Sequence, residues 1–98
     1  MNEKLKRTRS SGNVFRDLGF GKAEAENLKL RSALMLRIEE AYQRSAMTQA
    51  EAAPVLGLTQ PRLNALLKGK IGLFSLDALV NVAARAGLNV RLVVKKAA

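Results

Sequence analysis

The sequence predicts a small, mainly α-helical domain that ends in one β-strand. Three observations favour this fold: a long amphipathic segment over 23–44, two short helical segments joined at Gly57, and an alternating valine-rich stretch over 88–95. A chain of 98 residues makes one domain at most. We expect a disordered basic arm over 1–12, followed by a single domain over 13–98.

Composition narrows the function before any motif is considered. Seventeen Lys and Arg against eight Asp and Glu give a net charge of +9, which favours a polyanionic partner such as nucleic acid. The sequence has no Cys and no His, so it lacks thiolate and imidazole ligands and an imidazole base. We therefore expect neither a cofactor, nor a metal, nor an enzymatic activity. Without an apolar signal or spanning segment, a cytoplasmic location is expected.

The N-terminal part contains two different segments. In the arm over 1–12, four basic residues stand against one Glu, which is compatible with a solvated tail or with an arm that grips DNA phosphate or a partner. The following stretch over 13–20, NVFRDLGF, is apolar but too short for a core of its own. It is expected to dock on another surface.

A long helix is predicted over 23–44. Leu30, Leu34, Ile38 and Tyr42 recur every four residues, and no Gly or Pro interrupts the segment. These side chains form one apolar stripe. The stripe predicts the face that packs against the rest of the domain.

Two short helices follow in MTQAEAAPVLGLTQPRLNALLKGK. Thr48 is a suitable N-cap, and Glu51 completes a capping box for a helix over 49–56. Gly57 permits a turn with positive φ. Thr59 then caps a second helix, with Pro61 in its first turn, where the missing N–H matters little.

The C-terminal part predicts one more helix and then a strand. Ser75 is a good N-cap for the helix, and Gly87 supplies its stop. The alternation over 88–95 indicates a strand, but the sequence offers no second strand to pair with it. We expect this strand to pair antiparallel with its copy in a homodimer.

The paired short helices match the pattern of a DNA-binding helix-turn-helix. Small Ala53 stands where the helices cross, Gly57 forms the turn, and the leucines point inward while polar residues remain outside. A helical hairpin in any small basic protein shares some of these features. The combined pattern favours DNA binding, with the second helix reading base edges.

The candidate DNA-binding residues are polar side chains at the starts and free faces of these two helices. Gln60 and Asn64 suit adenine N6 and N7, while Arg62 and Lys68 suit guanine or phosphate. Asn64 and Arg62 are open between base contact, phosphate contact and solvation, and Lys68 favours phosphate. The full set is Gln49, Thr59, Gln60, Arg62, Asn64 and Lys68.

The sequence resembles the Xre/Cro-type helix-turn-helix antitoxins of type II toxin-antitoxin operons, the HigA-like branch. The segments that carry the resemblance are, in order, NVFRDLGF, the long helix, TQAEAA, GLTQPRLNALLKGK and FSLDALVNVAARAGLNVRLVV. The resemblance covers 13–94. It implies a lambda-repressor-like bundle and a homodimer that represses its own operon and neutralises an mRNA-cleaving toxin. It maps the recognition positions onto Thr59, Gln60, Arg62 and Asn64, with Gln49 near the phosphate backbone.

Two features depart from that family pattern. Pro54 lies inside the first short helix, where it removes one hydrogen bond to the Ala50 carbonyl, so we expect local distortion rather than loss of the helix. The chain is also basic, although antitoxins are often acidic where they touch a basic toxin. Glutamates on the long helix are a candidate toxin-facing surface or a plain solvated face: Glu24, Glu26, Glu39 and Glu40.

Other functions compatible with the sequence are a stand-alone phage-type repressor without a toxin and a protein-interaction module. In the second case Pro54 would spoil DNA docking, and NVFRDLGF would be the binding element.

Overall fold

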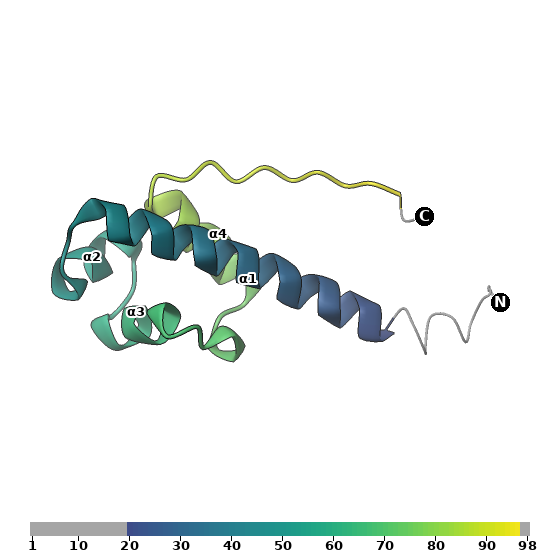
Figure 1. Cartoon of the computed structure of the whole chain (residues 1–98), viewed down its shortest axis with the longest axis horizontal. Helices are drawn as coiled ribbons and strands as arrows, with labels where there is room; N and C mark the ends of the chain where they lie inside the picture. Colours follow the sequence, from purple (N-terminus) through teal and green to yellow (C-terminus); the bar gives the residue numbers. More distant parts are fainter. Residues whose placement is uncertain (1–19, 97–98) are drawn as a thin grey trace. The chain divides into compact units, whose positions relative to one another are not determined.

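The computed structural model describes residues 20–96. This part contains α1 (Phe20–Ser45), α2 (Gln49–Leu56), α3 (Gln60–Leu67), the 3₁₀ helix η2 (Ile71–Leu73) and α4 (Leu76–Arg85) (Figure 1). Two compact units meet between Leu30 and Arg31, and the packing below concerns residues 31–96. The predicted arm over 1–12 and the segment over 13–19 lie outside the described residues.

Helix α1 confirms the long helix predicted from the apolar stripe and extends it by a few residues at its start. It ends at Ser45, whose hydroxyl donates to the Tyr42 carbonyl at 2.6 Å and accepts from the Met47 N–H at 3.1 Å. Ala46 follows with φ of 59°, in the left-handed region that L-residues other than Gly seldom occupy. These features turn the chain sharply into α2.

The predicted helix starts are confirmed. Thr48 and Glu51 form the capping box of α2: the Thr48 hydroxyl accepts from the Glu51 N–H at 3.2 Å, and the Glu51 carboxylate accepts from the Thr48 N–H at 2.9 Å. The Thr59 and Ser75 hydroxyls cap α3 and α4 by accepting from the Arg62 and Ala78 N–H groups, without the reciprocal carboxylate contact. Gly87, with φ of 84°, follows the end of α4. Local sequence thus sets the beginnings and ends of these helices.

Pro54 does not break α2. The helix continues through it to Leu56, so the prediction that the helix is not lost is confirmed, whereas the expected local distortion stays a prediction. Pro54 follows the capped start by little more than one turn, and its side chain is exposed. The capping box therefore supports the same short helix that the proline weakens.

The core gathers residues from α1, α2, α3 and α4 around Phe74, which is 1% exposed. Phe74 lies between η2 and α4, and its carbonyl accepts from Arg31 Nη1 on α1 at 3.1 Å. The Ile71 carbonyl accepts from the same nitrogen at 3.1 Å. The buried set is Met35, Ile38, Ala52, Ala53, Leu56, Leu63, Leu66, Phe74, Leu79, Val82 and Ala83.

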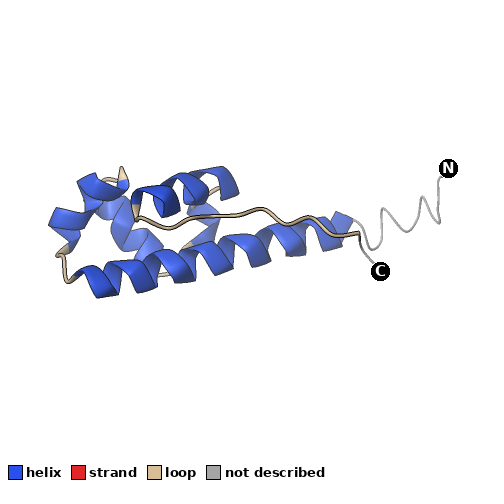
Figure 2. Cartoon of the chain, turned by 90° about the horizontal axis from the view of Figure 1, so that it is seen from above, coloured by secondary structure: helices blue, strands red, loops and turns tan. Residues whose placement is uncertain are grey.

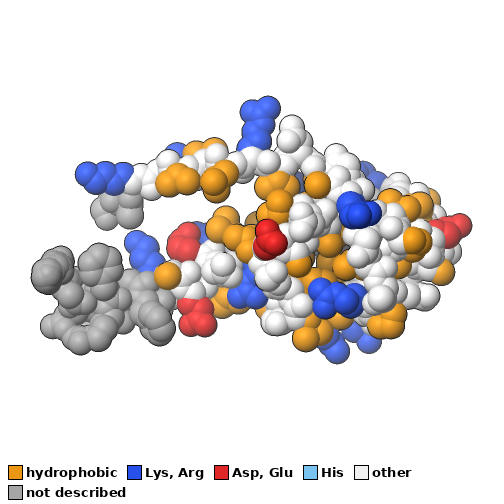
Figure 3. Space-filling model, turned by 180° about the vertical axis from the view of Figure 1, so that it is seen from behind, with side chains coloured by type: hydrophobic (Ala, Val, Ile, Leu, Met, Phe, Trp, Pro, Cys, Tyr) orange, Lys and Arg blue, Asp and Glu red, His pale blue; other side chains and the backbone are white. Residues whose placement is uncertain are grey.

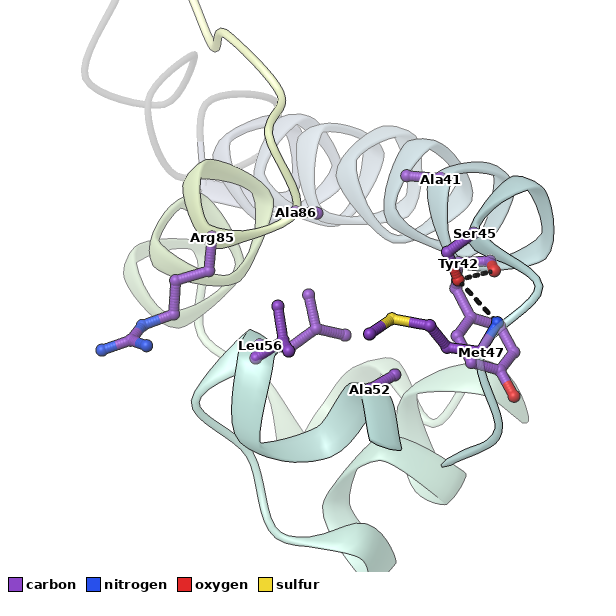
Figure 4. A pocket seen from close by; sticks show the side chains of 9 residues that line it. Ala41, Tyr42, Ser45, Met47, Ala52, Leu56, Arg85 and Ala86 are labelled. Carbon is purple, nitrogen blue, oxygen red and sulfur yellow. Dashed lines mark hydrogen bonds between the residues drawn. The ribbon is translucent and has the colours of Figure 1, made fainter. Parts of the chain in front are cut away.

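A small apolar cavity of about 110 Å³ lies beside the core, between the end of α1, α2 and the end of α4. The side chains of Met47 and Leu56 lie within this space in Figure 4, whereas the Arg85 side chain extends away from them. Arg85 is the one charged residue in its lining. It is a packing gap next to the α1–α2 turn.

The predicted C-terminal strand is not present in the single chain. Residues 88–96 follow α4 as an extended segment that makes no strand, and Figure 2 draws this segment as loop. Leu88 packs against the core, but the side chains further along are strongly exposed, with 85% for Leu92, 73% for Val93 and 81% for Val94. A strand needs the hydrogen bonds of a neighbouring strand, and none of the described residues supplies one.

None of the described helices is both long enough and apolar enough to cross a membrane.

Candidate nucleic-acid interface

Helices α2 and α3 form the two arms of a helix-turn-helix. Gly57 ends α2 with φ of 72° and ψ of 26°, and the Leu58 N–H donates to the Ala53 carbonyl at 2.9 Å. Ala53 is 3% exposed, so its small side chain lets the two helices approach closely. Leu63 and Leu66 hold the inner face of α3 in the core. The outer face of α3 is left free for a ligand.

Four residues, from the start of α2 and from the first half and middle of α3, line an open cleft of about 390 Å³: Gln49, Gln60, Pro61 and Asn64. We call this the amide cleft. The Asn64 side-chain amide donates to the Gln49 side-chain oxygen at 3.5 Å, a long and weak hydrogen bond. Both amides therefore keep most of their capacity to bind a base edge. The structure thus brings together three of the predicted site residues.

Arg62 lies on the opposite flank of α3. Its guanidinium carbon stands 4.5 Å from the centroid of the Phe74 ring, within the range of a cation–π contact. It does not line the amide cleft and instead lines a groove toward α4. Of its predicted roles, phosphate contact fits this position better than a base contact shared with Gln60 and Asn64.

Thr59 and Lys68 stand at the two ends of α3. The Thr59 hydroxyl accepts from the Arg62 N–H at 3.3 Å, so its oxygen is engaged in capping. Its hydroxyl hydrogen is still available to a phosphate oxygen. Lys68 is exposed at the C-cap, away from the amide cleft, which suits a phosphate contact better than base reading.

The charge around these helices is predominantly positive. Figure 3 shows Lys and Arg side chains spread over the end of the molecule that carries the helix-turn-helix. No acidic residue lines the amide cleft. Among the described residues, no group of three or more His, Cys, Asp or Glu could hold a metal ion. The positive charge around the cleft suits binding of a polyanion.

The comparison with protein families decides the identity of the fold. A model described as a helix-turn-helix domain matches residues 14–95. The chain belongs to this family. A solved structure of an XRE-family transcriptional regulator is similar to this helix-turn-helix protein with a TM-score of 0.70 and 28% identity, covering 76% of this chain and 83% of the other. A search of curated proteins found no match.

The comparisons confirm the Xre-type helix-turn-helix part of the resemblance. The antitoxin branch and the homodimer stay predictions.

Sequence reasoning missed two residues that shape the surface of this helix-turn-helix protein. Phe74 was not recognised as the aromatic partner of Arg62, because contacts of this kind depend on tertiary packing. Arg85 lies close against Gly57, where an added Cβ would stand 2.9 Å from its Nε. A glycine in a tight turn was a partial signal for that close approach.

Proposed function

We propose that the protein is a sequence-specific DNA-binding transcriptional repressor. The observation that carries this proposal is the amide cleft, which brings together three uncharged amides from α2 and α3 in a basic helix-turn-helix protein. Amide side chains pair bidentately with adenine in the major groove. Binding, rather than catalysis, is the proposed activity.

In the proposed complex α3 enters the major groove. Gln60 and Asn64 contact base edges, and Gln49 at the start of α2 supports Asn64 through their mutual hydrogen bond. The free N–H groups at the starts of α2 and α3 face backbone phosphates. Lys68 adds a phosphate contact at the far end of α3.

The proposal includes a homodimer paired through the C-terminal segment. The exposed apolar side chains of Leu92, Val93 and Val94 support it, because an extended apolar segment of this kind is stabilised by an antiparallel copy. Such a dimer places two recognition helices about 34 Å apart on a palindromic operator. Leu92→Lys is expected to shift the protein from dimer to monomer in analytical ultracentrifugation, and an unchanged mass would exclude pairing through this segment.

The proposal extends to an antitoxin that also represses its operon, on the strength of the resemblance to the HigA-like branch. Glu39 and Glu40 on α1 are half-buried acidic groups, and Glu40 accepts from Arg37 at 3.4 Å. If they face a basic toxin, reversing both to Lys weakens toxin binding. Unchanged binding would assign them to a solvated helix face.

The test of DNA binding is a fluorescence titration of DNA from upstream of the protein's own reading frame at two salt concentrations. The parent is expected to bind specifically and to weaken steeply with salt, because bound phosphates release counterions. Gln60→Ala combined with Asn64→Ala should remove the sequence preference. The matched control replaces two exposed amides of α1, Asn27→Ala with Gln43→Ala, and should bind as the parent does.

Absence of binding, or binding that ignores the loss of both amides, would refute the repressor. The function would then move to protein interaction through the exposed apolar segment over 90–94.

A further inference from the structure

A second polar surface lies on the side of α3 that faces away from the amide cleft. It is a groove of about 570 Å³ between the α2–α3 turn and α4. Its polar side chains are Arg62, Asn81 and Arg85, and its floor includes Leu56, Leu58 and Val82. No acidic residue lines it. We call this surface the arginine groove.

Arg62 is held at one wall of the arginine groove by the ring of Phe74. The guanidinium carbon is 4.5 Å from the ring centroid, and the ring itself is almost fully buried. Arg31 fixes the backbone at this point, since it donates to the Phe74 carbonyl at 3.1 Å. The Arg62 guanidinium is therefore partly pre-organised, and a planar guanidinium keeps its edge donors free while it stacks.

Arg85 lies at the other wall, close against the turn of the helix-turn-helix. A Cβ on Gly57 would stand 2.9 Å from Arg85 Nε and 3.0 Å from its Cδ, so glycine lets this side chain lie against the turn without shifting. Figure 4 shows the Arg85 side chain directed away from the apolar cavity. None of the ion pairs within the described residues engages Arg62 or Arg85.

We propose that the arginine groove is an anion site that takes a phosphate group. Two guanidiniums and one amide supply its donors, and guanidinium forks match phosphate oxygens. The phosphate comes from the backbone of bound DNA, in which case the site rests on the proposed function, or from free phosphate. On DNA, α3 would read bases from one flank and grip the flanking backbone with the other.

Whether the bound phosphate belongs to the DNA backbone is tested by the salt dependence of DNA binding for three variants. Arg62→Gln and Arg85→Gln should each reduce the slope of log K against log salt by about 1 while leaving the preferred sequence unchanged. Lys29→Gln is the charge-matched control on an exposed position of α1, and its slope should equal that of the parent. Circular dichroism checks that the exposed substitutions leave the helices intact.

Whether the groove binds free phosphate is tested by NMR of the arginine Nε–H signals while inorganic phosphate is added. Joint, saturable shifts of Arg62 and Arg85 support the site even if no DNA binds, so the failure of the repressor proposal is distinguishable. Changed slopes without phosphate shifts assign the site to the DNA backbone. Unchanged slopes together with unmoved signals overturn the proposal.

Discussion

Arg31 Nη1 donates to the carbonyl of Phe74 at 3.1 Å and thereby ties α1 to the segment that links η2 and α4. The same nitrogen also reaches the Ile71 carbonyl at 3.1 Å. The Ile71 carbonyl at the start of η2 and the Phe74 carbonyl just after η2 thus share a charged donor that lies 40 and 43 residues earlier in the chain. The contact holds Phe74 and its loop against the helix bundle.

The first prediction concerns the loss of this donor. Arg31→Gln is expected to lower the free energy of unfolding by about 1–3 kcal/mol, because part-buried carbonyls lose a charged partner. The value stays toward the lower end since Arg31 Nε is buried without a hydrogen-bond partner within the described residues. Urea denaturation followed by circular dichroism measures the change.

The control for Arg31 is the same substitution on the same helix. Arg37→Gln removes an exposed ion pair with Glu40, at 3.4 Å, and should change stability by less than about 0.5 kcal/mol. Equal losses for the two variants would mean that the carbonyl contacts contribute nothing specific.

A second prediction follows from the left-handed backbone at Ala46, with φ of 59°. Ala46→Gly should stabilise the protein by about 0.5–1 kcal/mol, because relief of the strain exceeds the added flexibility of the unfolded chain. Ala33→Gly, at an exposed position within α1, should instead destabilise by about 1 kcal/mol. Thermal unfolding of both variants gives the comparison, and a loss of stability in Ala46→Gly contradicts the assignment of strain.

The two prolines give a third prediction. Pro54→Ala restores a donor to the Ala50 carbonyl and should stabilise the protein by about 1–3 kcal/mol. Pro61→Ala changes the first turn of α3, where the missing N–H costs nothing, so its effect should be within about 0.5 kcal/mol or slightly destabilising. If Pro54→Ala is no more stable than the parent in chemical denaturation, α2 has already absorbed the proline without cost.

The fourth prediction uses two glycines with similar backbones. Gly57 and Gly69 have φ of 72° and 76°, so alanine at either position should cost about 1–2 kcal/mol of stability. Arg85 is flexible and can move from an added Cβ at position 57, whereas nothing lies near Gly69. Only Gly57→Ala should therefore weaken salt-dependent DNA binding, measured by fluorescence titration. Equal binding losses would show that the position of Arg85 does not matter.

Much of the fold was predictable because it depends on local chemistry. The residue types and spacing of Thr48, Thr59 and Ser75 predict where the helices start. Gly57 predicts the turn, because glycine tolerates positive φ. The structure confirms each of these. The C-terminal strand is not formed among the described residues, and its pairing with a second copy stays a prediction, because alternation specifies a strand only when a neighbour supplies hydrogen bonds.

The residues of the candidate site could be predicted from the sequence, but their separation onto two flanks of α3 could not. The structure brings Gln49, Gln60 and Asn64 to one cleft, since Gln60 and Asn64 lie one turn apart on α3 and the start of α2 lies beside them. Arg62 lies on the other flank, where it contacts the ring of Phe74, a residue beyond the end of α3. No periodicity or spacing marks a contact between residues from separate elements, so this separation required the structure.

The amide cleft also affects how the discrimination between DNA sequences depends on salt. Its three side chains carry no charge, so their contribution to telling one base from another depends little on ionic strength. Attachment to arbitrary DNA, by contrast, rests on counterion release and fades as salt rises. For the proposed repressor, a rise in cellular salt would therefore weaken non-specific DNA binding more than it reduces the discrimination between operator and other sequences. A smaller share of the protein would then be bound at non-specific sites.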